Sequence, residues 1–89
     1  MKELYLEVTF RHGRALAAYL YLPRDPDDRS ARTWRVEPGL IVDFTADGKP
    51  IGIEITAPGQ ISLTVINRVL QELGRSPVTQ ADLAPLLAA

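Results

Sequence analysis

The first ten residues alternate between apolar and polar side chains, which is the period of a β-strand. Every second residue from Leu4 to Phe10 is apolar, and Tyr5, Glu7 and Thr9 stand between them. Such alternation is typical of a strand that buries one face. A glycine at position 13 suits the positive φ angle of a tight turn, so we expect the chain to reverse there.

The next run, 15–22, reads Ala-Leu-Ala-Ala-Tyr-Leu-Tyr-Leu and is apolar on both alternating faces. Alanine and leucine favour a helix, so a helix is compatible with this composition. The two tyrosines, the preceding turn and the stop at Pro23 favour a central strand instead. After the polar loop 23–31, residues 32–37 alternate again, with Trp34 and Val36 on one face, until Pro38-Gly39 breaks the pattern.

Two apolar runs, 40–46 and 49–56, flank Asp47-Gly48 and predict a β-hairpin. Asp-Gly favours the type I′ turn of a two-residue loop. A three-residue loop would shift the register by one and place Leu40 opposite Glu54, which spoils the apolar face. Pro50 has no N–H to donate, which predicts an edge or a strand terminus at this point. The expected facing pairs are Phe44 with Ile51, Val42 with Ile53, and Leu40 with Ile55.

The C-terminal third changes to the helical period. Residues 62–73 place their apolar side chains on one face, Ser62 is a suitable N-cap and Gly74 a suitable C′ residue. Further on, the spacing of Thr79 and Asp82 resembles a capping box, which predicts a short tail helix over 79–84. Pro85 is expected to end or kink that helix.

These elements predict an α+β fold in a single domain over residues 1–89. An antiparallel sheet of four or five strands occupies about 2–56, with one C-terminal helix packed on one face and a short helical tail. One helix of this length covers only one face of such a sheet. The other face would expose an apolar patch suited to association, unless the tail folds back over it. The predicted interface residues are Tyr19, Tyr21, Trp34 and Ile41, where the alternation does not firmly fix the facing of Trp34.

Composition narrows the classes of function. The chain has 89 residues, a formal net charge of -1 and no cysteine. The balanced charge gives no field that attracts nucleic acid, and the six arginines between 11 and 35 are interrupted by aspartates. Disulfides and thiolate metal sites are excluded. No segment has the length of a membrane span or the pattern of a signal peptide, so we expect a cytoplasmic protein without membrane contact.

Three titratable residues are weak candidates for a ligand site. Asp43 and Glu54 fall on the same face of the predicted hairpin as diagonal neighbours, where paired carboxylates could divide acid and base roles. Polar residues on the wetter face of a sheet are the simpler interpretation, because nothing else of a site accompanies them. His12 is the only histidine, so a histidine metal cluster or catalytic triad is excluded. We therefore predict no catalytic residue, no metal and no cofactor.

Three segments between Leu6 and Thr56 carry a family resemblance. The run "ALAAYLYLP" and the block "VEPGLIVDFTADGKPIGIEI" resemble the small bacterial domain of unknown function family 2283, and the loop before "VEPG" agrees in character only. The departures are "RHG" before the alanine strand and the long tail after "ITAPG". The resemblance implies a small sheet domain with a C-terminal helix and no established activity. It also implies an antitoxin-like role, because members sometimes lie beside toxin genes.

The leading functional hypothesis is a non-enzymatic interaction module that forms a homodimer or binds another protein, through the tyrosine-bearing face or an edge strand. An antitoxin-like partner of a small toxin is the second hypothesis. A small-ligand-binding protein or enzyme that uses Asp43 and Glu54 is the third.

Overall fold

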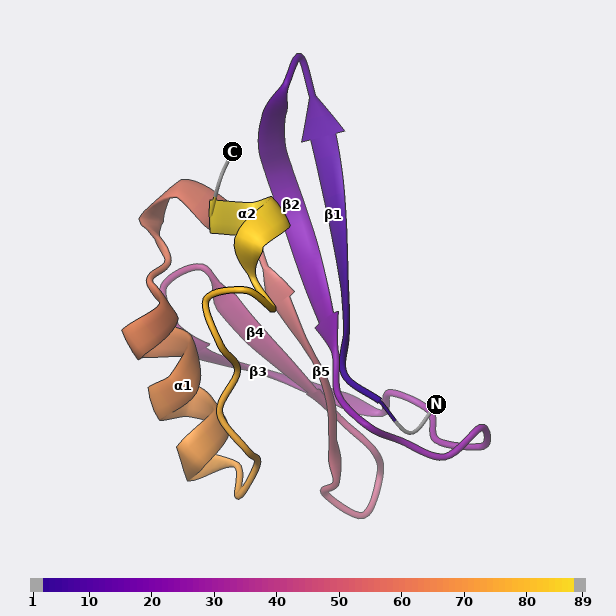
Figure 1. Cartoon of the computed structure of the whole chain (residues 1–89). Coiled ribbons are helices and arrows are strands. Elements are labelled where there is room, and N and C mark those ends of the chain that lie inside the picture. Colours follow the sequence, from indigo (N-terminus) through magenta and orange to yellow (C-terminus); the bar gives the residue numbers. More distant parts are fainter. Residues whose placement is uncertain (1–2, 88–89) are drawn as a thin grey trace.

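The computed structural model describes residues 3–87 and confirms the predicted α+β fold. Five strands form one antiparallel sheet, and the helices follow it in the sequence (Figure 1). The elements are β1 (Tyr5–Arg11), β2 (Arg14–Tyr21), β3 (Arg32–Glu37), β4 (Leu40–Phe44), β5 (Pro50–Ile55), the 3-10 helix η1 (Pro58–Gln60), α1 (Leu63–Glu72) and α2 (Ala84–Leu87).

The strand order is β1-β2-β5-β4-β3, so β1 and β3 are the edges of the sheet. β2 lies between β1 and β5, which confirms the central strand and excludes the helix that its alanines also allowed. Ala18 and Leu20 of β2 lie in the core, and Tyr19 and Tyr21 project from the other face of the sheet. Pro50 begins β5, which is an interior strand. Of the two positions predicted for this proline, the structure therefore selects the strand terminus.

The β1–β2 hairpin closes with a two-residue turn. His12 and Gly13 both have positive φ angles, 53° and 77°, as a type I′ turn requires. Farther from the turn, Thr9 pairs with Ala17 and Phe10 pairs with Ala15. The extra residue, Leu16, belongs to β2, so β1 itself runs without a bulge.

The β4–β5 hairpin has the predicted faces but not the predicted loop. Leu40 pairs with Ile55 and Val42 with Ile53, as expected, whereas Phe44 pairs with Pro50 instead of Ile51. The loop contains three residues, 46–48: the Gly48 N–H donates to the Thr45 carbonyl at 3.0 Å, and Gly48 has a φ of 90°. This is a turn followed by a glycine bulge. A register shift between Asp43 and Phe44 compensates for the longer loop and keeps the apolar side chains on one face.

The core lies between one face of the sheet and α1. Ser62 caps α1 by accepting a hydrogen bond from the Val65 N–H at 3.2 Å, as predicted. At the other end, the N–H groups of Gly74 and Arg75 donate to the carbonyls of Gln71 and Leu70, as in a Schellman motif. The buried core residues are Ala18, Leu20, Leu22, Leu40, Val42, Ile53, Ile55, Ile61, Ile66, Val69, Leu70, Val78, Leu83 and Leu86.

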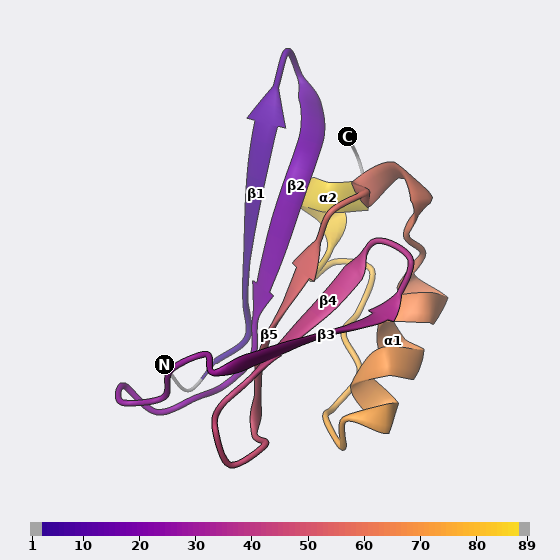
Figure 2. The same ribbon diagram turned by 180° about the vertical axis from the view of Figure 1, so that it is seen from behind.

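The tail completes this same core. Thr79 and Asp82 exchange the two hydrogen bonds of a capping box, at 2.8 and 3.1 Å. Turns follow, and the helix occupies Ala84–Leu87 instead of 79–84. Pro85 lies in its first turn, where a missing N–H leaves no intrahelical bond unmade, so it does not end a helix. Figures 1 and 2 show α1 and α2 on the same side of the sheet, so the described tail does not cover the second face.

Candidate functional site

None of the described helices lies over the face of the sheet opposite α1, and we call this face the open face (Figure 2). Its side chains follow from the strand register in two rows. The first row is Glu7, Tyr19, Glu54, Ile41 and Arg35, and the second is Tyr5, Tyr21, Gly52, Asp43 and Thr33. The open face is therefore aromatic near β1 and β2 and carries carboxylates in its middle.

Tyr19 lies across the middle of the open face. Its hydroxyl donates a hydrogen bond to the Asp43 carboxylate at 2.6 Å, although their strands are separated by β5. The ring passes over Gly52 of β5, where an added Cβ would collide with it. Burial, and then the hydrogen bond to Asp43, raise the pKa of the Tyr19 phenol well above its usual value. Position 52 must therefore lack a side chain, because the Tyr19 side chain crosses it to reach from β2 to Asp43 on β4.

The three tyrosines of the open face contact one another. The rings of Tyr19 and Tyr21 meet edge-on with centroids 4.6 Å apart, and Tyr5 lies 5.7 Å from Tyr21. The guanidinium of Arg24 lies 5.4 Å from the centre of the Tyr21 ring, within cation–π distance. Tyr19 and Tyr21 are consequently half-buried by their neighbours, while Tyr5 remains 54% exposed.

Three of the four predicted interface residues come together. Tyr19, Tyr21 and Ile41 are on the open face. Trp34 pairs with Val42, whose side chain is in the core, so Trp34 projects from the opposite face, where it is 69% exposed at the β3 edge. The prediction that Trp34 joins the tyrosine cluster is therefore wrong. Residues paired across neighbouring strands project from the same face of the sheet, so Trp34 shares the face of Val42.

The predicted carboxylate candidates are on one face but are not a free pair. Asp43 faces Gly52 and Glu54 faces Ile41, the diagonal arrangement that the hairpin register predicted. Asp43, however, accepts a hydrogen bond from the Tyr19 hydroxyl, and Glu54 is exposed. His12 lies in the exposed turn of the β1–β2 hairpin. Among the residues that the structure describes, no group of three potential metal ligands occurs.

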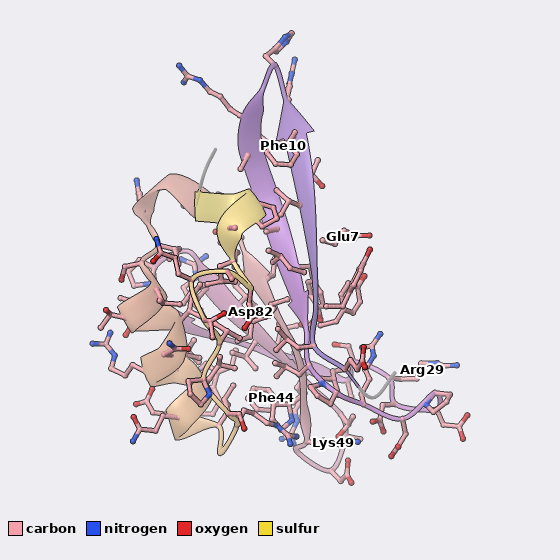
Figure 3. The ribbon with its side chains drawn as sticks, in the orientation of Figure 1. Glu7, Phe10, Arg29, Phe44, Lys49 and Asp82 are labelled. Atoms are coloured by element: carbon pink, nitrogen blue, oxygen red, sulfur yellow. The ribbon has the colours of Figure 1, made fainter. Side chains whose placement is uncertain are left out.

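The structure reveals a second candidate surface at the edge of β1, which the sequence did not single out. Phe10 is 51% exposed on this strand and Leu16 is 55% exposed beside it on β2. Figure 3 shows Phe10 near the tip of the hairpin and Glu7 on the outer side of β1. Phe10 lies on the same alternating face of β1 as Leu6 and Val8, which pack against the core. The hairpin extends beyond the helices, so its apolar positions near the tip lie where no helix covers them (Figure 1).

A comparison with known families supports the resemblance. Residues 17–57 match the model of the family described as Protein of unknown function (DUF2283). Residues 17–57 are therefore similar to this family. The match extends from β2 to the residues after β5, so the resemblance predicted from Leu6 is confirmed from residue 17 onward. Within the matched segment, the block "GIEI" forms most of β5, the strand that carries Gly52.

Other comparisons add no relative. No curated protein and no solved structure shows significant similarity to the chain. No helix among the described residues has the length and apolar character to cross a membrane. The function of this chain must therefore be argued from its own surface.

Proposed function

We propose that this chain is a non-enzymatic self-association module that forms a homodimer through the free edge of β1. The observation that carries the proposal is that β1 is a regular seven-residue edge strand without proline, glycine or lysine. Natural edge strands usually carry such residues or a bulge, because an unprotected edge pairs with another strand. In this hairpin the bulge belongs to β2, so it does not protect β1.

The other edge strand, β3, is better protected than β1 against pairing with a further strand. β3 is shorter, with six residues, and its register shifts between Arg35 and Glu37. Glu37 is also tied to α1 through an ion pair with Arg68 at 2.6 Å. A bulge on an edge strand opposes pairing with a further strand. The asymmetry between the two edges favours β1 as the contact surface.

The open face is the weaker alternative for contact between copies. Its tyrosines already pack on one another, and the Tyr19 hydroxyl is bonded to Asp43. Packing two open faces together would take Glu54 out of water at the centre of the interface, and Glu54 has no ion-pair partner among the described residues. Burying an unpaired charge opposes association. The hydrogen bond from the Tyr19 hydroxyl to Asp43 also argues against Asp43 and Glu54 as an acid–base pair. This supports a non-enzymatic role.

The experiment is a measurement of molar mass by light scattering across a range of concentrations. We expect the mass to rise from the monomer to the dimer value as concentration increases. Phe10→Lys places a charge on the β1 edge and should shift the transition to higher concentration. Trp34→Lys is the matched control, since it adds a lysine in place of an exposed aromatic residue on the other edge. A monomer mass at every concentration would disprove the proposal.

A further inference from the structure

We propose that two copies pair β1 with β1′ in antiparallel orientation about a two-fold axis at Thr9, so that their sheets become continuous. This inference rests on the proposed function and specifies the register of the contact. A two-fold axis makes the interface isologous, so every pair of residues across it occurs twice. In this register Glu7 faces Arg11 of the second copy and Val8 faces its Phe10.

The part of β1 from Glu7 to Arg11 is the part with open space beside it. At the other end of the strand, Tyr5 lines a hollow of about 310 Å³ together with Tyr21 and residues of the loop 24–29. A second strand placed beside Tyr5 would meet this loop. Figures 1 and 2 show no other element along the outer side of β1 nearer the hairpin tip. The accessible edge is therefore centred near Thr9.

Charge is self-complementary in this register. Arg11 is directly opposite Arg14 within the chain, and like charges in this position are destabilising. Among the described residues, neither arginine has a carboxylate partner. Glu7 receives only a long contact of 3.5 Å from the Tyr21 hydroxyl. Pairing at Thr9 gives each Arg11 a carboxylate from the other copy and places Glu7 and Arg11 on the same face of the joined sheet.

The other face of β1 agrees with the same register. Val8 packs against the core and is half-buried, whereas Phe10 is 51% exposed. Opposing Phe10 to Val8 of the second copy covers its ring with an apolar side chain, a favourable cross-strand pair. At the axis, Thr9 faces Thr9, which is also a suitable pair on a sheet.

Neighbouring registers lose these pairs. A two-fold axis at Val8 would place Glu7 opposite Thr9 and leave Arg11 opposite Tyr5. An axis at Glu7 would oppose two carboxylates, which is destabilising. A one-residue slip of one strand alone would join the apolar face of one copy to the polar face of the other. Thr9 is the centre at which charge, apolar contact and free space agree.

Cysteine cross-linking tests the register directly, because the chain contains no cysteine. Residues directly opposite in antiparallel strands have Cα atoms about 4.5–5.5 Å apart, within disulfide range. Thr9→Cys should therefore give a covalent dimer under mild oxidation. Glu7→Cys is the matched control on the same strand and face. Its two Cα atoms would be offset by about 13 Å along the strands, four residues at 3.3 Å each, so we expect little cross-linking.

Charge reversal provides an independent readout of dimer dissociation. Glu7→Arg would face Arg11 of the other copy twice and should weaken the dimer on the order of tenfold. Adding Arg11→Glu to the same chain should recover most of that loss. A wild-type dimer in which Val8→Cys cross-links faster than Thr9→Cys would overturn the register. A wild-type dimer that cross-links at neither position would overturn the β1 contact, and a wild-type monomer would overturn the proposed function itself.

Discussion

The Tyr19 hydroxyl donates to the Asp43 carboxylate at 2.6 Å and thereby connects β2 to β4 over the top of β5. The bond exists because position 52, between them, has no side chain: Gly52 is buried beneath the tyrosine ring. The Tyr19 side chain thus spans three adjacent strands, β2, β5 and β4. Asp43, which the sequence offered as a candidate acid, is a structural acceptor in this arrangement.

Gly52→Ala is expected to destabilise the fold by roughly 1–3 kcal/mol, the usual cost of overpacking. The new Cβ collides with the Tyr19 ring, so the ring must leave Asp43. Urea unfolding measures the change. In a Tyr19→Ala background the same substitution should cost much less, since the colliding group is gone. Equal costs in both backgrounds would contradict the role assigned to Gly52.

Tyr19→Phe should lower the free energy of unfolding by about 1 kcal/mol at neutral pH, because it removes the hydrogen bond to Asp43 and keeps the ring. Urea unfolding of the two proteins under the same conditions gives the difference. Tyr5→Phe is the control, since Tyr5 is exposed and no hydrogen bond of its hydroxyl is described. A comparable loss in both variants would show that the Asp43 bond is not the cause.

Alkaline pH should remove the contribution of the Tyr19 hydroxyl. Burial and the hydrogen bond to Asp43 raise the pKa of the folded-state phenol, so folding favours the neutral form. That contribution is complete below about pH 10, the ordinary tyrosine pKa, and declines as the pH rises above it. The stability difference between the wild type and Tyr19→Phe should therefore shrink above about pH 10. A difference that grows with pH would contradict the shift.

Asn67→Ala is expected to lower the free energy of unfolding by about 1–3 kcal/mol. The Asn67 amide donates to the Val78 carbonyl at 3.0 Å and accepts from the Val78 N–H at 2.8 Å, which holds the buried start of the tail against α1. Both backbone groups of Val78 lose their partner in the variant. Thr64→Ala, an exposed change on the same helix, is the control and should have a small effect. Thermal unfolding of both variants provides the comparison.

Ser62→Ala tests the start of α1. The Ser62 hydroxyl oxygen satisfies the Val65 N–H, which has no partner within the helix. We expect a loss of about 1 kcal/mol in the free energy of unfolding. Ser62→Asp retains an acceptor at the same position and should restore most of the stability. An equally large loss in Ser62→Asp would show that the cap is not the contribution being removed.

The sequence alone determined most of the elements and the apolar face of the β4–β5 hairpin. Period-two alternation identified the strands, and the N-cap, capping-box and C′ residues located α1 and the start of the tail, because these signals depend on neighbours close in the chain. The run "ALAAYLYLP" and the block "VEPGLIVDFTADGKPIGIEI" carried the family resemblance, which the match over residues 17–57 supports. The faces of β4 and β5 were also fixed locally, since Leu40, Val42, Ile53 and Ile55 must share one side.

Only the tertiary structure decided how these elements meet. It gave the β4–β5 hairpin a three-residue loop with a compensating register shift, placed Trp34 opposite Val42, and put the tail on the helix side of the sheet. The sequence pattern also did not determine the order of the strands in the sheet. This order brings Tyr19 to Asp43 and leaves β1 at an edge. Local pattern sets which face a side chain takes. Which strand lies beside it depends on contacts between residues distant in the sequence, which the pattern does not encode.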